Sequence, residues 1–68
     1  MGALRVTLTG NGEAWIENYR GILEYSDEMI LLQGKNCRVC FEGTHLSIDY
    51  YTNEDMKISG SITCVRYQ

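Results

Sequence analysis

One stretch of the chain, Ile22 to Phe41, recurs 26 residues further on without a gap, and this repetition limits the fold more than any other feature. The sequence YSDE at 25–28 aligns with YTNE at 51–54, and alternating apolar positions, a glycine and a second apolar pair follow in both copies. A hydroxyl residue followed by Asp or Asn is typical of a tight turn. The alternative is that two β-hairpins resemble each other only in composition.

Apolar and polar residues alternate along most of the chain, which is the period of half-buried β-strands. Leu4, Val6 and Leu8, for example, alternate with arginine and threonine. Residues 13–20 fit either a strand or a helical face. We favour the strand, because a helix there would have only about two turns and would end at Gly21.

The apolar positions change parity within each copy of the repeat. In the first copy, the pair that starts at Ile30 is even-numbered and the pair that starts at Val39 is odd-numbered. A strand exchanges its buried face only at a turn or a bulge, because its side chains alternate with a period of two. We predict a turn at residues 34–36, a turn at Gly43 and a bulge or sharp bend at Gly60. The glycines to which we assign a structural role are Gly21, Gly34, Gly43 and Gly60.

These patterns predict an all-β fold, with about seven short, mostly antiparallel strands in a single small domain that spans residues 1–68. The sheet should curl into a small barrel or a two-layer sandwich, because a flat sheet of this size leaves its edges exposed. The chain contains no proline, so every backbone amide can join a ladder.

Composition argues against several classes of partner. Acidic and basic residues are interleaved and the net charge is −3, so nucleic acid and anionic membrane surfaces are poor partners. No apolar run approaches the roughly 18 residues of a membrane span, and Arg5 interrupts any apolar signal core. Three cysteines without a signal sequence indicate reduced thiols and a cytoplasmic protein.

The sequence contains no catalytic constellation, so we predict neither an enzyme nor a cofactor. Cys37 and Cys40 have the CxxC spacing of many zinc ligands, with His45 and Cys64 elsewhere. On a strand, however, residues three apart point to opposite faces, so both sulfurs cannot reach one metal without a turn. We therefore predict no metal site, with Cys37 and Cys64 in the core and Cys40 on the other face.

The tyrosines and the tryptophan are the strongest functional signal. Both residue types are enriched at protein interfaces, and a chain of 68 residues has too small a core to hold them all. The alternative is that two or three of them cap the ends of the core. Small size and an edge that no proline blocks also predict self-association, most simply as a dimer. The residues expected to contact a partner are Trp15, Glu17, Tyr19 and Arg20.

Several segments resemble the YabP/YqfC family of sporulation proteins, and its YqfC branch in particular. They are NYRGILEY at 18–25, Gly43-x-x-Leu46-x-Ile48, MKISGSI at 56–62 and VRY at 65–67. The resemblance extends from about Val6 to Tyr67. It implies a role in endospore formation, in the mother-cell compartment of a spore-forming bacterium, and it implies no enzymatic activity, cofactor or catalytic residue.

Two hypotheses for the function follow. The first is a non-catalytic sporulation protein that works through contacts with another sporulation protein. The second is a β-module that binds a small ligand or a carbohydrate. A deep pocket with convergent polar groups would favour the second hypothesis, and an apolar patch rimmed by polar residues would favour the first.

Overall fold

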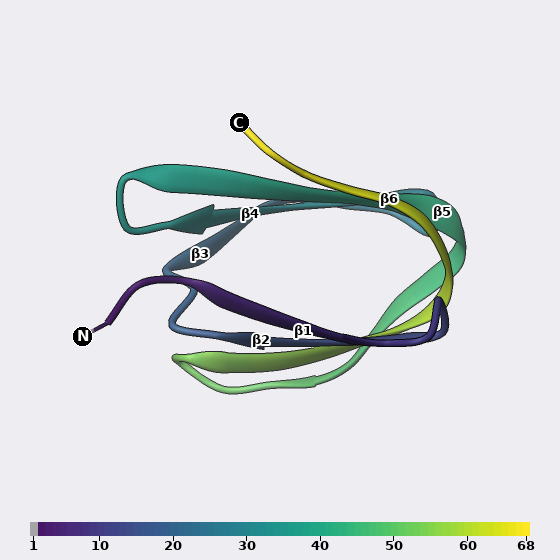
Figure 1. Ribbon diagram of the computed structural model, residues 1–68, viewed down its shortest axis with the longest axis horizontal. Coiled ribbons are helices and arrows are strands. Elements are labelled where there is room, and N and C mark those ends of the chain that lie inside the picture. The colour runs from purple at the N-terminus through teal and green to yellow at the C-terminus, as the bar shows by residue number, and fades with distance from the viewer. Residues whose placement is uncertain (1) are drawn as a thin grey trace.

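Six strands form one antiparallel sheet in the computed structural model, which describes residues 2–68 and contains no helix in that range (Figure 1). The strands are β1 (Arg5–Thr9), β2 (Glu13–Glu17), β3 (Gly21–Tyr25), β4 (Met29–Gly34), β5 (Cys37–Tyr51) and β6 (Asp55–Tyr67). The predicted all-β fold is confirmed, whereas the expected number of about seven strands is wrong. Residues 13–17 form a strand, as we favoured.

The sheet folds over on itself because its two longest strands, β5 and β6, bend in the middle (Figure 1). The strand order is β1-β2-β6-β5-β4-β3. One layer contains β3, β4, the first half of β5 and the end of β6, and the facing layer contains β1, β2, the start of β6 and the end of β5. Since β1 and β3 each pair on one side only, the sheet is not closed into a barrel.

Gly43 does not turn the chain, contrary to our expectation. It lies inside β5, which remains paired with β6 on both sides of it. The register between the two strands shifts between Glu42 and Gly43 and again between Thr44 and Ser47, which bends the strands without ending them. A Cβ at Gly43 would lie 1.9 Å from the carbonyl oxygen of Ser61, so β6 approaches this position too closely for a side chain.

Side chains from the inner faces of both layers form the core. The predicted change of parity follows from the turn after Gly34, because β4 and β5 then pair with Ile30 opposite Phe41 and Leu32 opposite Val39. Asn36 takes a left-handed conformation in this turn, with a φ of 63°. The fully buried large side chains are Phe41, Ile16, Ile30, Leu32, Met56, Ile58, Val39 and Cys40.

Cys40 is the buried cysteine, whereas Cys37 and Cys64 are only partly buried. Cys37 packs against the core, as expected, but Cys64 is not among the residues that pack there, so the expectation is wrong for Cys64. Cys40 points away from the core cluster, as expected, but it lies between Leu31 and Arg66 in the sheet register. Burial raises the pKa of the Cys40 thiol, and the nearby Glu42 carboxylate raises it further. The described residues bring together no group of three or more His, Cys, Asp or Glu side chains that could hold a metal.

Two turns 26 residues apart make the same hydrogen bonds. Ser26 Oγ accepts hydrogen bonds from the amides of Glu28 and Met29, at 3.2 and 3.0 Å. Thr52 Oγ1 accepts them from the amides of Glu54 and Asp55, at 3.2 and 2.9 Å. In both cases the hydroxyl group takes the amides that a tight turn leaves without a backbone partner.

The strands that flank these turns also share their register. Ile22 pairs with Leu32 in the first hairpin, and Ile48 pairs with Ile58 in the second. The likeness ends at the glycine that follows, because the chain turns after Gly34 but continues along β6 after residue 60. The two hairpins therefore match, whereas the full repeat of residues 22–41 is not confirmed and stays a prediction.

Gly60 lies at the bend of β6, in the strand where we expected a bulge or sharp bend. Its φ is 130°, a conformation that residues with a side chain rarely adopt. An added Cβ would lie 2.5 Å from the carbonyl oxygen of His45 and 2.9 Å from the Cα of Leu46. At Gly34 an added Cβ would lie 3.0 Å from the Leu4 Cβ, whereas at Gly21 it would meet open space, so nothing steric requires a glycine there.

We predict that Gly60→Val lowers the free energy of unfolding by about 2 kcal/mol or more, because both the φ angle and the contact with β5 oppose a side chain. Urea denaturation followed by circular dichroism measures this change. Gly21→Val is the matched control and should cost less than about 0.5 kcal/mol. Equal midpoints for Gly60→Val and the unmodified protein would show that the bend does not depend on glycine.

Candidate functional site

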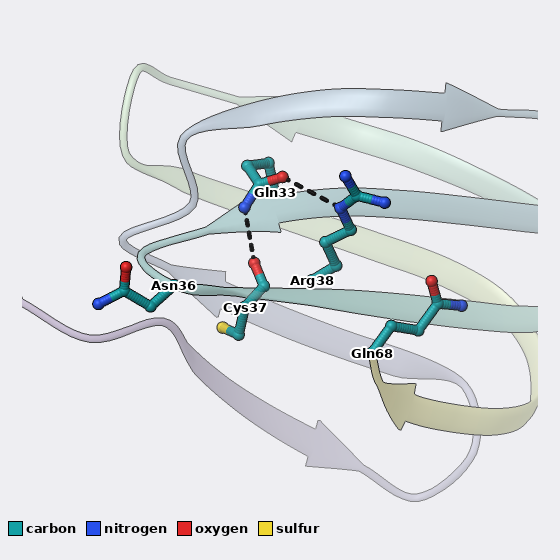
Figure 2. A pocket seen from close by; sticks show the side chains of 5 residues that line it. All are labelled: Gln33, Asn36, Cys37, Arg38 and Gln68. Carbon is teal, nitrogen blue, oxygen red and sulfur yellow. Dashed lines mark hydrogen bonds between the residues drawn. The ribbon is translucent and has the colours of Figure 1, made fainter.

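A polar hollow of about 350 Å³ lies beside the turn between β4 and β5. Figure 2 shows its lining, in which the Gln33 side chain lies between Arg38 and the backbone of Cys37. The Gln33 amide donates hydrogen bonds to the carbonyl oxygens of Cys37 and Gly34, at 2.9 and 2.8 Å, and accepts one from Arg38 Nε at 3.3 Å. Because these groups already bind one another, they are poorly placed to hold a ligand. The residues that line this hollow are Gln33, Asn36, Cys37, Arg38 and Gln68.

A second group of polar and aromatic side chains lies on the outer face of the layer that contains β1 and β2. The register places Thr7, Trp15, Lys57 and Tyr50 side by side across β1, β2, β6 and β5. The Trp15 and Tyr50 rings make an edge-to-face contact, with centroids 6.0 Å apart. We call this face the Trp15 surface, which is made of Glu13, Trp15, Glu17, Asp49, Tyr50, Asp55 and Lys57.

Lys57 connects the aromatic pair to the acidic side chains. Its ammonium nitrogen lies 5.2 Å from the centroid of the Trp15 ring, which is the geometry of a cation–π contact. The same nitrogen lies 3.4 Å from Glu13 Oε2 and 3.6 Å from Asp49 Oδ2. The Lys57 side chain is only 22% exposed, so its contacts are less screened by water than those of a surface lysine.

Asp49 lies at a register shift in β5, between the paired residues Ile48 and Tyr50. Its carboxylate oxygen Oδ1 accepts hydrogen bonds from Ser59 Oγ at 2.8 Å and from Ser47 Oγ at 3.2 Å. The hydrogen bond from Ser59 is the main cause that holds the pKa of Asp49 below its ordinary value, and Ser47 and Lys57 lower it further. This ionised carboxylate anchors Lys57 beside the Trp15 ring.

A hollow of about 230 Å³ opens next to the Trp15 ring, and we call it the Trp15 pocket. Two carboxylates border it, Glu17 and Asp55, which lie directly opposite each other in the pairing of β2 with β6. Arg5 Nη1 lies 3.6 Å from Glu17 Oε1, and both side chains are largely exposed. The residues that line the pocket are Thr7, Trp15, Ile16, Glu17, Tyr50, Asp55 and Met56.

The four predicted contact residues do not lie together. Trp15 and Glu17 both border the Trp15 pocket. Tyr19, however, is 5% exposed and belongs to the core, where its hydroxyl donates a hydrogen bond to the carbonyl oxygen of Thr52, so it is not an exposed contact residue. Burial raises the pKa of Tyr19 above its ordinary value. Arg20 is exposed but outside the pocket lining, and its amide donates a hydrogen bond to the carbonyl oxygen of Gln33 at 2.7 Å.

Sequence reasoning did not single out Tyr50, Asp49, Asp55 or Lys57 as parts of one surface with Trp15. These residues join Trp15 because β2 pairs with β6, and no local pattern encodes that pairing. Asp55 directly follows the turn sequence YTNE at 51–54, so the local sequence gives no sign of its position opposite Glu17. The available signal was indirect, because the sole tryptophan occupies an exposed position in an alternating strand.

Comparison with known proteins identifies similar sequences. The sequence model of the YabP family matches residues 2–68. An uncharacterised protein of Bacillus subtilis (strain 168), YqfC, is 32% identical over 63 residues, which cover 93% of this chain and 68% of YqfC. No solved structure matches the chain. Within residues 2–68, no helix is long and apolar enough to cross a membrane.

The Asp49 network predicts a pH dependence of stability. Because the folded state lowers the pKa of Asp49 from its ordinary value of 3.8, the ionised carboxylate stabilises the fold above that pH. This contribution is lost as the pH falls through the lowered pKa. We expect the free energy of unfolding to decrease more steeply below about pH 4 in the unmodified protein than in Asp49→Asn.

Urea denaturation at a series of pH values between about 6 and 2 measures these slopes. Asp27→Asn is the matched control, since Asp27 is an exposed aspartate outside the network, and it should follow the unmodified protein. If Asp49→Asn instead shows the same slope as the unmodified protein, the serine hydrogen bonds do not stabilise the ionised carboxylate.

Proposed function

Because the chain belongs to the YabP family, we propose that it acts in endospore formation through contacts with other proteins rather than by catalysis. The family name supports the link to sporulation, and the resemblance to the YqfC branch supports the mother-cell compartment as its location. The observation that carries the proposal of protein contacts is the exposed Trp15–Tyr50 pair on the outer face of the sheet.

Large aromatic side chains on a small protein favour an interface function. Trp15 and Tyr50 are 37% and 45% exposed, although each could bury a large apolar area against a partner. Charged and hydrogen-bonding groups surround the pair, which is the anatomy of an apolar anchor inside a polar rim. Tryptophan and tyrosine are also the residue types that contribute most to binding energy at interfaces.

A second copy of the chain is one partner that the sheet can accommodate. The edge strand β3 pairs only with β4 and carries three exposed apolar side chains, Ile22, Leu23 and Tyr25. No proline or lysine blocks the edge. Pairing of β3 with its counterpart in a second molecule would cover this apolar edge and give a two-fold dimer.

The alternative function, a module that binds a small ligand or a carbohydrate, has less support. The polar groups of the larger hollow bind one another, as Gln33 does with Arg38 and Cys37. The Trp15 pocket, at about 230 Å³, is smaller than the roughly 300–1,000 Å³ of typical small-molecule sites.

We predict that deleting the gene in its spore-forming host reduces the yield of heat-resistant spores and that a Trp15→Ala copy fails to restore it. Loss of a tryptophan at the centre of an interface costs about 2 kcal/mol or more, which is about 30-fold in affinity. Tyr67→Ala is the matched control, because Tyr67 is an exposed aromatic residue outside the Trp15 surface, and it should restore spore formation. Normal sporulation of the deletion strain, or full restoration by Trp15→Ala, would refute the proposal.

For the homodimer, we predict that light scattering at micromolar concentration gives twice the 7.8 kDa mass of one chain. The interface should bury more than about 1,000 Å² in total. Leu23→Lys places a charge on the β3 edge and should give the mass of one chain. Thr9→Lys, on the opposite edge strand β1, should still give the mass of the dimer. A concentration-independent mass of one chain for the unmodified protein would exclude the dimer.

A further inference from the structure

We propose that the Trp15 pocket binds a cationic side chain, lysine or arginine, presented by a partner protein. This inference rests on the proposed function, because it names the chemical group through which the protein contacts would form. Three features of the pocket carry it: two carboxylates on paired residues, an aromatic wall that already accepts an ammonium group, and a volume that suits one long side chain.

The two carboxylates of the pocket belong to residues that pair directly across β2 and β6. Glu17 and Asp55 are direct partners in the pairing of β2 with β6, and like charges in that position destabilise a sheet. Arg5 forms an ion pair with Glu17 at 3.6 Å, but Asp55 forms no ion pair within residues 2–68. A cation in the pocket would lie between two negative charges and relieve their repulsion.

The Trp15 ring already binds an ammonium group of the same chain. Lys57 Nζ lies 5.2 Å from the ring centroid, held there by Glu13 and Asp49. Glu13 and Glu17 occupy the positions two residues before and two residues after Trp15 on the same face of β2, so the Lys57 ion pairs and the pocket lie toward opposite ends of the strand. The ring therefore borders one filled and one open cation position.

The shape of the pocket suits one long side chain. Its volume of about 230 Å³ is below the range of typical small-molecule sites. The Trp15 and Tyr50 rings border it, and the methylene groups of lysine or arginine pack on such aromatic surface while the charged end stays near water. The net charge of −3 also favours association with a basic partner.

The sole tryptophan makes binding directly measurable, because fluorescence excited at wavelengths where only tryptophan absorbs reports on Trp15 alone. The probes are N-acetyl-lysine methylamide and N-acetyl-arginine methylamide, with N-acetyl-norleucine methylamide as an uncharged equivalent of lysine. We expect the two cationic probes to change the emission saturably, with dissociation constants on the order of 1 mM. Sodium chloride should weaken their binding, and norleucine should give no saturable change.

Two double variants test whether binding depends on the carboxylates of the pocket or only on the negative net charge of the protein. Glu17→Gln with Asp55→Asn should abolish the saturable change, yet the melting temperature should change little, because the lost Arg5–Glu17 ion pair is exposed and two acids in direct register are removed with it. Asp55→Asn alone should weaken binding at least about threefold, as the loss of one ion pair of about 0.7 kcal/mol would. The matched control, Glu24→Gln with Asp27→Asn, removes two exposed carboxylates elsewhere and should bind like the unmodified protein.

Three results would overturn the proposal: equal responses to norleucine and lysine, undiminished binding by the Glu17→Gln, Asp55→Asn variant, or saturation by N-acetylglucosamine but not by the cationic probes. The last result would identify a carbohydrate site instead. These outcomes are independent of spore formation. If Trp15→Ala abolishes sporulation but no cation binds, the proposed function stands and the cation pocket is rejected. If cations bind but Trp15→Ala has no effect on spore formation, the cation pocket stands and the proposed function is rejected.

Discussion

The bend shared by β5 and β6 is the constraint on which the rest of the structure depends. It lets one sheet cover both sides of the core. It also brings β5 and β6 so close together at Gly43 and Gly60 that neither position has room for a side chain. A bend also takes backbone amides out of the ladder, and buried amides need new acceptors. Two turns supply them: the β3–β4 turn accepts hydrogen bonds from the amides of Gly43 and Leu46, and the β1–β2 turn accepts them from those of Gly60 and Ile62.

This arrangement explains how so short a chain buries a continuous core. Each long strand contributes inner-face side chains to both layers, as Phe41 and Leu46 do within β5. The same shared strands leave two edges, β1 and β3, that no further strand covers. A chain of this size also buries a modest fraction of its surface. The exposed apolar residues of β3 are therefore a consequence of the architecture. Pairing of β3 with another molecule would cover them without any change in the fold.

Local chemistry could be read from the sequence, and non-local pairing could not. The alternation of residues, the serine and threonine turns and the change of parity around Gly60 are all visible in the local sequence, so they were predictable. Gly43 was misassigned because a glycine within an alternating run fits a turn and a bend equally well, and only the neighbouring strand decides. The Trp15 surface was predicted in part: Trp15 and Glu17 were named, but Lys57 reaches them through a pairing between β2 and β6 that no periodicity encodes.

The Trp15 surface departs from a rule that the rest of the sheet obeys. Ion pairs between neighbouring strands join opposite charges, as in the pairs of Arg5 with Glu17 and Arg66 with Glu42. Glu17 and Asp55 are instead two acids in direct register, beside an exposed tryptophan. Sequences that fold well agree across local and global levels, and the places where they do not are expected to be functional sites. The repulsion is tolerated because both carboxylates reach water, and a bound cation would convert it into attraction. Both acids border the same pocket as the aromatic pair, which is a physical reason to place recognition on this face rather than at the polar hollow.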